Sequence, residues 1–144
     1  MERLFSFIGN AGNGKRNLAL FVKRYKGILL MILEGQVILF KFPQTDQKEG
    51  KLRPALILRK LPGNLNDYLI CMISSQIHAQ IPELDEIIIP EDSDFSMSGL
   101  KQASAIRILR LAVVNESVFL GKIGQIDNER LNRIRHNLAL WING

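Results

Sequence analysis

The stretch KFPQTDQKEGKLRPALIL, residues 41–58, decides the fold, because it predicts a strand, a polar loop and a second strand. Apolar side chains run up to Phe42, are nearly absent from the residues that follow, and return without a break at residues 55–58. So polar a loop lies at the surface, since its backbone groups need water or other partners. We therefore expect a surface loop that re-enters a buried strand near Arg53.

Two roles are open for Arg53 at this junction. A guanidinium fixed where a loop meets a strand is a good anchor for a phosphate, because its donors match pairs of phosphate oxygens. Alternatively, Arg53 pairs with an acid of its own loop, such as Asp46 or Glu49. The stretch alone leaves both interpretations standing.

The composition is that of a globular protein with one core. The chain has 144 residues, 47% of them apolar and 23% charged, which suits a single soluble domain. Its one cysteine, Cys71, rules out an internal disulfide and suits the reducing cytoplasm. The longest apolar run, residues 28–33, is far shorter than the roughly 20 residues that span a bilayer, and no secretory cleavage site follows it.

The net charge of +5 belongs to the N-terminal part. Residues 1–30 carry six basic side chains and one acidic one, whereas the remaining 114 carry thirteen of each. Residues 9–16 match a phosphate-binding loop up to its lysine, but Arg16 replaces the magnesium-binding hydroxyl, so we expect no nucleotide site. We expect residues 1–30 to be a basic extension, either a flexible arm or a segment upstream of a natural start at Met31, and residues 31–144 to be the folded domain.

From Glu34 onward the pattern is mostly β. Strands are expected at residues 35–42, 54–61, 67–75, 86–89, 104–111 and 119–126, a turn at 61–66, an irregular stretch at 76–85, an acidic loop at 91–98 and a helical turn at 99–102. A helix follows Asp127, which is a good N-cap. Its apolar stripe consists of Leu131, Ile134, Leu138 and Trp141, and it is predicted to pack on the sheet or on a second subunit. Arg130, Arg133 and Arg135 occupy its other faces.

The candidate chemistry is that of a phosphodiester. His78 and His136 have no partner at metal-ligand spacing, so we expect no metal. Arg53, Ser74 and Arg107 interrupt otherwise apolar strand ends or interiors. Each also has a plain explanation, because Ser74 can bond a neighbouring strand and Arg107 can face water. Spacing alone does not show that the three converge.

Several segments in the right order resemble the MazF/PemK family of toxin endoribonucleases, over about residues 34–143. The similar segments are residues 35–40 (GQVILF), 42–43 (FP), 45–47 (TDQ), 53–58 (RPALIL), 73–76 (ISSQ), 98–101 (SGLK) with Ser104 and Arg107, and 120–124 (LGKIG) before a C-terminal helix. The resemblance implies a mainly β fold with helices (α+β), in which a small curved antiparallel sheet forms a partly open, SH3-like barrel. It also implies a homodimer.

The resemblance further implies the toxin of a type II toxin–antitoxin system, a cytoplasmic mRNA interferase. Such a toxin is a metal- and cofactor-independent endoribonuclease that cleaves single-stranded RNA sequence-selectively. Its partners are RNA, a cognate antitoxin and, together with that antitoxin, DNA. By this resemblance Arg53 matches the catalytic arginine, Ser74 stands at a catalytic threonine, and Arg107 matches an arginine of the RNA site. The RNA-binding residues expected beside Arg107 are Asp46, Gln47, Lys51, Gln76 and His78.

The general base is left unassigned. Attack by the RNA 2′-OH needs a proton acceptor, and Asp46 and His78 are the candidates. The first loop lacks the histidine found in some members, and Leu109 stands where others hold an acid. Two alternatives therefore remain: a non-catalytic toxin or binding protein on the same scaffold, like a gyrase poison, and a degenerate toxin blocked by its N-terminal extension. Arg53 and a strand-end hydroxyl favour the nuclease.

Overall fold

The computed structural model describes residues 32–41 and 51–144. Six strands form one antiparallel sheet in the order β4-β5-β3-β2-β1-β6. The elements are β1 Gln36–Lys41, β2 Leu52–Lys60, β3 Asp67–Ser74, the 3₁₀ turn η2 Ile77–Ala79, β4 Glu86–Ile88, α3 Phe95–Ser98, β5 Ser104–Asn115, the 3₁₀ turn η3 Glu116–Val118, β6 Phe119–Gln125 and α4 Asn128–Asn143. The predicted class, mainly β with helices and a curved antiparallel sheet, is confirmed. The predictions for residues 1–30, and for Asp46 and Gln47, lie outside the described residues.

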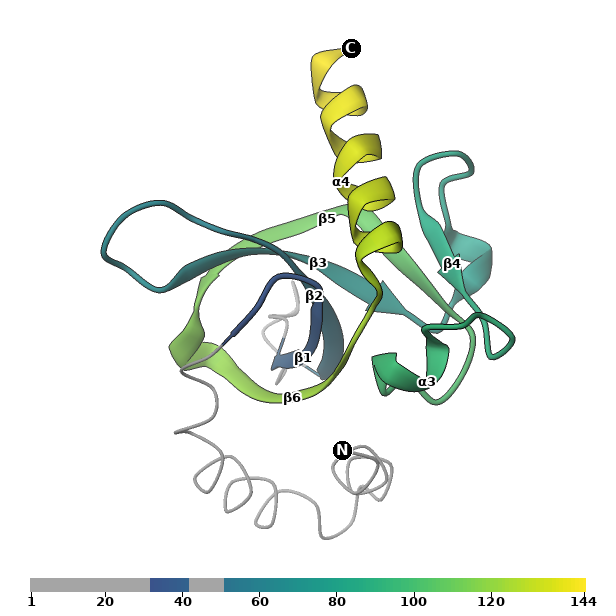
Figure 1. Cartoon of the computed structure of the whole chain (residues 1–144), viewed down its shortest axis with the longest axis horizontal. Coiled ribbons are helices and arrows are strands. Elements are labelled where there is room, and N and C mark those ends of the chain that lie inside the picture. The colour runs from purple at the N-terminus through teal and green to yellow at the C-terminus, as the bar shows by residue number, and fades with distance from the viewer. Residues whose placement is uncertain (1–31, 42–50) are drawn as a thin grey trace, which may run out of the picture.

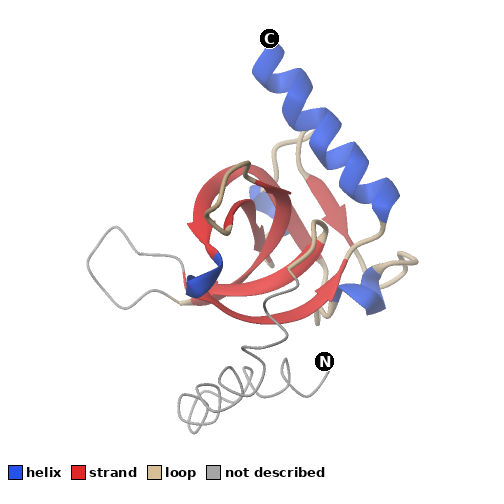
Figure 2. Ribbon diagram, turned by 60° about the vertical axis from the view of Figure 1, so that its left-hand side comes forward, coloured by secondary structure: helices blue, strands red, loops and turns tan. Residues whose placement is uncertain are grey.

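The strands bend round into a ring-like sheet, and α4 lies to one side of it (Figures 1 and 2). Register shifts interrupt three of the strand pairs, which bends and twists the sheet locally. The largest is between β3 and β5, where Cys71 pairs with Leu111 but the next residue, Met72, pairs with Arg107. Residues 108–110 of β5 therefore have no partner in β3.

Alternating side chains divide the core into two clusters, one on each face of the sheet. The cluster that includes α4 contains Val37, Leu39, Leu56, Leu58, Cys71, Ile73, Ile106, Ile108, Ile123, Leu131, Ile134 and Leu138 among its members. The other contains Ile32, Ile38, Phe40, Ala55, Ile57, Tyr68, Ile70 and Phe119. Burial on both faces explains why residues 55–58 are apolar without alternation.

Helix α4 is held at the sheet by its cap and by Arg135. The carboxylate of Asp127 accepts a 2.7 Å bond from the Arg130 amide, as the predicted N-cap requires. Arg135 donates from Nε and Nη2 to the Leu58 carbonyl at 3.0 and 2.8 Å, and also to Glu34. Leu58 lies at the register shift between β2 and β3, so the guanidinium satisfies a carbonyl where the ladder is interrupted.

Trp141 does not pack on the sheet of its own chain: it is 56% exposed, because α4 runs on past the strands (Figure 1), and packing on a second subunit stays a prediction. Three other expectations need correction. The helical turn is Phe95–Ser98, not 99–102, and Gly99 ends it in the left-handed region with φ +74°. Strand β5 continues to Asn115, which pairs with Asp67 at the start of β3. Strand β2 begins at Leu52, so Arg53 is inside the strand and not in the loop before it.

Candidate functional site

Arg53, Ser74 and Arg107 lie on one face of the sheet. In an antiparallel sheet, directly paired residues point to the same face, as do residues two apart in one strand. Ala55 pairs with Met72, and Met72 pairs with Arg107. Arg53 precedes Ala55 by two residues, and Ser74 follows Met72 by two. The register therefore gives the three predicted residues a common face, which spacing along the chain could not show.

Arg53 and Ser74 also lie at the same end of neighbouring strands. The β2–β3 ladder ends at the pair Ala55–Met72, and Arg53 and Ser74 each lie two residues beyond that pair, at the same end of the two strands. On its other side Arg53 pairs with Phe40, whose side chain belongs to the buried cluster of Ile38 and Ala55. Both Arg53 and Ser74 are half-buried, so this end of the face borders the core on one side and solvent on the other.

The hydroxyl of Ser74 is oriented by the segment that follows it. The Ser74 Oγ accepts a 3.1 Å hydrogen bond from the Gln76 amide. The O–H group of Ser74 can therefore donate a hydrogen bond to another group. His78 lies in η2 just beyond, with an exposed side chain, and Gln76 and Lys51 are exposed as well. A guanidinium and a hydroxyl of half-buried residues at the same end of one face, with exposed polar groups beside them, can bind and polarise a phosphate group.

Arg107 is held by a carboxylate that sequence reasoning did not single out. Its Nε donates to Asp85 Oδ2 at 3.1 Å, and the side chains of the two residues are 15% and 1% exposed. The plain expectation that Arg107 faces water is therefore wrong. The sequence does show that Asp85 ends the irregular stretch just before β4. No local pattern predicts its contact with Arg107 of β5.

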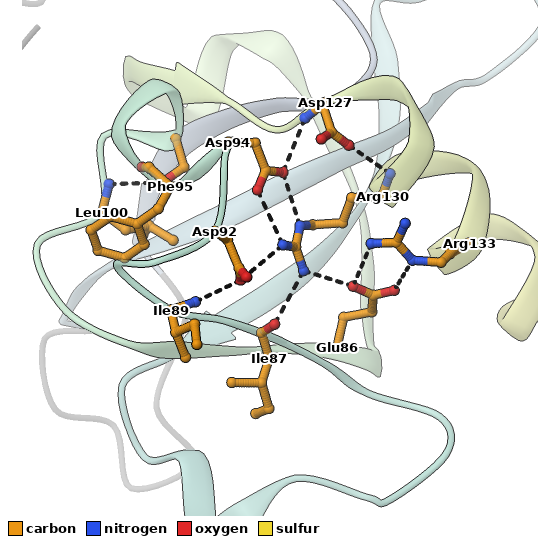
Figure 3. A network of polar contacts seen from close by, with 11 residues as sticks. Glu86, Ile87, Ile89, Asp92, Asp94, Phe95, Leu100, Asp127, Arg130 and Arg133 are labelled. Atoms are coloured by element: carbon orange, nitrogen blue, oxygen red, sulfur yellow. Dashed lines mark hydrogen bonds and ion pairs between the residues drawn. The ribbon is translucent and has the colours of Figure 1, made fainter.

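A second unpredicted feature is a buried arginine in α4. Arg130 donates to Asp94 from Nε and Nη2 at 2.9 and 3.1 Å, to Glu86 at 2.7 Å, to Asp92 at 3.0 Å and to the Ile87 carbonyl at 3.1 Å (Figure 3). The sequence placed it off the apolar stripe of the helix, and its side chain is nevertheless only 7% exposed. The network ties α4 to β4 and to the acidic loop before α3, which is a structural role.

Burial and pairing shift the pKa values in this network in opposing directions. Desolvation alone would raise the pKa of Asp94, but the hydrogen bonds from Arg130 and from the Asp127 amide, with the charge of Arg130, lower it below its ordinary value. Desolvation would lower the pKa of Arg130, and Asp94, Glu86 and Asp92 raise it instead. Asp94 is therefore a carboxylate kept charged by its partners.

Cys71, the one cysteine of the chain, is fully buried in the core. Burial raises the pKa of the Cys71 thiol, which accordingly behaves as a small core side chain. Residues 32–41 and 51–144 contain no group of three or more His, Cys, Asp or Glu side chains placed to hold a metal ion. Nor does this part of the chain contain a helix long and apolar enough to cross a bilayer.

The comparisons with known proteins agree with this fold. The family model described as "PemK-like, MazF-like toxin of type II toxin-antitoxin system" matches residues 33–142. No curated protein sequence matches the chain.

Among solved structures, the Mycobacterium tuberculosis toxin MazF-mt6 has a TM-score of 0.54 at 14% identity, with 75% of this chain and 96% of that chain covered. An endoribonuclease in complex with its cognate antitoxin from a mycobacterial species has a TM-score of 0.56 at 14% identity, covering 78% and 95%. MazE-MazF from Deinococcus radiodurans has a TM-score of 0.52 at 13% identity, covering 76% and 92%. At such identities the likeness shows a shared fold.

Proposed function

Since the chain belongs to the PemK-like, MazF-like family of toxins of type II toxin–antitoxin systems, we propose that it is an endoribonuclease that cleaves single-stranded RNA at Arg53 and Ser74. The observation that carries this proposal is the strand register, which puts these two residues at one end of β2 and β3 on one face. A guanidinium and a hydroxyl in that relation fit the two oxygens of a phosphodiester. The endoribonuclease among the similar structures supports the same activity.

RNA supplies its own nucleophile, the 2′-OH next to the scissile phosphate. Attack forms a phosphorane that carries more negative charge than the ground state, so fixed cationic donors accelerate the step by stabilising that charge. Arg53 supplies this stabilisation and, in our proposal, protonates the leaving 5′-oxygen. Ser74, whose Oγ is oriented by the Gln76 amide, donates a hydrogen bond to a phosphate oxygen and keeps its proton.

Residues around this pair position the RNA strand. Arg107 faces the same side and contributes a second cation, and Lys51, Gln76 and His78 are exposed near the ends of β2 and β3. Unpaired RNA exposes its base edges to such polar side chains, whereas duplex RNA hides them. His78 is the candidate base within the described residues. Asp46 and Gln47 belong to the proposal from sequence alone.

We further propose a cognate antitoxin as partner, and a homodimer in the cytoplasm, with residues 31–144 as the toxin domain. One of the similar structures is an endoribonuclease in complex with its cognate antitoxin, which supports the first of these. DNA binding would then be a property of the toxin–antitoxin complex. The N-terminal extension at residues 1–30 is tested by comparing growth arrest caused by the full chain with that caused by a chain starting at Met31.

The experiment is incubation of the purified protein with a long single-stranded RNA transcript in EDTA. We expect discrete cleavage by the wild type, and a loss of roughly 100- to 1,000-fold in rate for Arg53→Ala, as for removal of one transition-state donor. Arg59→Ala is the matched control, because this second β2 arginine is exposed and lies 3.8 Å from Glu34. Wild-type cleavage by Arg53→Ala would overturn the assignment. Growth arrest by a protein that leaves RNA intact would favour the non-catalytic, gyrase-poison-like alternative.

A further inference from the structure

A single buried carboxylate organises the bulge in β5. Asp85 Oδ1 accepts from the Ile108 amide at 2.8 Å, and Ile108 is the first of the residues that have no partner in β3. Asp85 Oδ2 accepts from Arg107 Nε at 3.1 Å and from the Ile81 amide at 2.8 Å. The carboxylate thus replaces the missing ladder partner of the bulge, and a bulge redirects the side chains beside it.

The same contact fixes the orientation of Arg107. A guanidinium is planar, so a hydrogen bond that fixes the position of Nε also determines where both terminal nitrogens point. The hydrogen bond of Arg107 to Asp85 is made by Nε, and within residues 32–41 and 51–144 the two terminal nitrogens have no partner. Two donors on a rigid fork remain for a ligand, on the face shared with Ser74 and Arg53.

Asp85 also joins Arg107 to the segment that follows Ser74. The turn from Ile81 to Asp85 is closed twice, by the Asp85 amide on the Ile81 carbonyl at 2.9 Å and by the Ile81 amide on the Asp85 carboxylate. The side chain of Asp85 is 1% exposed. Asp85 therefore has its acceptor capacity directed to protein donors and does not reach a substrate itself.

We propose that Asp85 is the positioning residue of the RNA site: it orients the terminal nitrogens of Arg107 toward a phosphate of the bound single-stranded RNA. This inference rests on the proposed function. It predicts that Asp85 contributes to RNA binding only through Arg107.

The test uses a short RNA centred on the linkage that the wild type cuts first in a long transcript. Affinity is measured with the same oligonucleotide carrying 2′-deoxyribose at that linkage, and cleavage is measured with the all-ribose form. Asp85→Asn keeps an oxygen that accepts from the Ile108 amide, but it presents an NH₂ group to Arg107 Nε and to the Ile81 amide, which are both donors. We expect it to weaken affinity about 10- to 100-fold, the effect of losing a hydrogen bond to a charged group, with a smaller change in kcat than in KM.

The decisive readout is the double variant. In the Arg107→Ala background, Asp85→Asn should weaken affinity no further, because the group that it orients is gone. A merely structural role would give losses that multiply. Asp67→Asn is the matched control, since Asp67 is a half-buried β3 carboxylate that accepts from Asn115 at 3.0 Å at the opposite end of the strands. It should bind RNA as the wild type does.

The outcomes separate the inference from the proposed function. A wild type that cuts no RNA overturns both. If Arg107→Ala weakens affinity but Asp85→Asn does not, the inference alone fails. If Asp85→Asn does not fold, Arg107→Lys answers the question with Asp85 intact: lysine keeps the charge but has no Nε to be held, and we expect it to bind at least 10-fold more weakly than wild type. Wild-type affinity for Arg107→Lys would contradict the inference.

Discussion

Replacing the buried Arg130 by methionine should lower the stability of the fold far more than the same change at the exposed Arg133 of α4. The variant keeps the aliphatic bulk but removes five hydrogen bonds, of which two go to Asp94. Asp94 would remain almost fully buried with the Asp127 amide as its remaining donor outside its own turn. Removing one partner of a buried ion pair costs about 3–5 kcal/mol.

Thermal unfolding followed by circular dichroism measures this effect. For a domain of this size, the loss corresponds to a fall in Tm of roughly 10–20 °C. Arg133→Met is the matched control in the same helix. Arg133 is exposed and, within the part of the chain that the structure describes, hydrogen-bonds to Glu86, so the expected loss is below about 1 kcal/mol. Equal Tm values for the two variants would refute the structural role assigned to Arg130.

The acid limb of the stability curve provides an independent check. The pKa of Asp94 is lower in the folded protein than its ordinary value of about 3.9. Its contribution to the free energy of unfolding is therefore fully present above that value and is lost as the pH falls through the lower, folded pKa. The wild type should lose stability over this range, and Arg130→Met should lose less. A steeper acid limb in the variant would contradict the assignment.

Three further changes test other contacts. Gly124→Ala should destabilise the fold strongly, because its Cβ would lie 2.1 Å from the Met97 carbonyl oxygen; an unchanged denaturant midpoint would contradict the close packing of α3 on β6. Arg135→Met should lower the free energy of unfolding by about 1–3 kcal/mol through the unsatisfied Leu58 carbonyl, and no loss would mean that water replaces the guanidinium. A single 2′-deoxyribose at the cleaved linkage should abolish cutting there while leaving affinity nearly unchanged, and cutting at that linkage would rule out attack by the 2′-OH.

Most of the sheet could be predicted, because burial on both faces leaves long apolar runs such as residues 55–58. Strand ends were less predictable. Strand β5 continues past Leu111 through Ala112 and Val114, which pack against the second cluster, and this contact depends on a partner strand about 40 residues away in sequence. Trp141 followed the helical period of α4, but the period says nothing about where the sheet ends.

The charged residues show a similar limit. Arg53, Ser74 and Arg107 could be found because each interrupts an apolar stretch, whereas the placement of Arg107 on the face of the other two depends on a bulge that the sequence does not mark. Arg130 could only be placed off the apolar stripe of its helix, since its partners Asp94 and Glu86 lie 36 and 44 residues away. Asp85 and Arg107 are likewise far apart in the sequence, at a separation of 22 residues. Such pairs belong to the tertiary fold, and a local pattern cannot predict them.

The most direct test is the single-turnover rate of RNA cleavage by Arg53→Ala, Ser74→Ala and the double variant. If the two side chains act on the same phosphate, each single variant should lose most of the rate. The double variant should then be little slower than the worse of the two. Losses that multiply, or a single variant that cleaves at the wild-type rate, would contradict a shared site at the ends of β2 and β3.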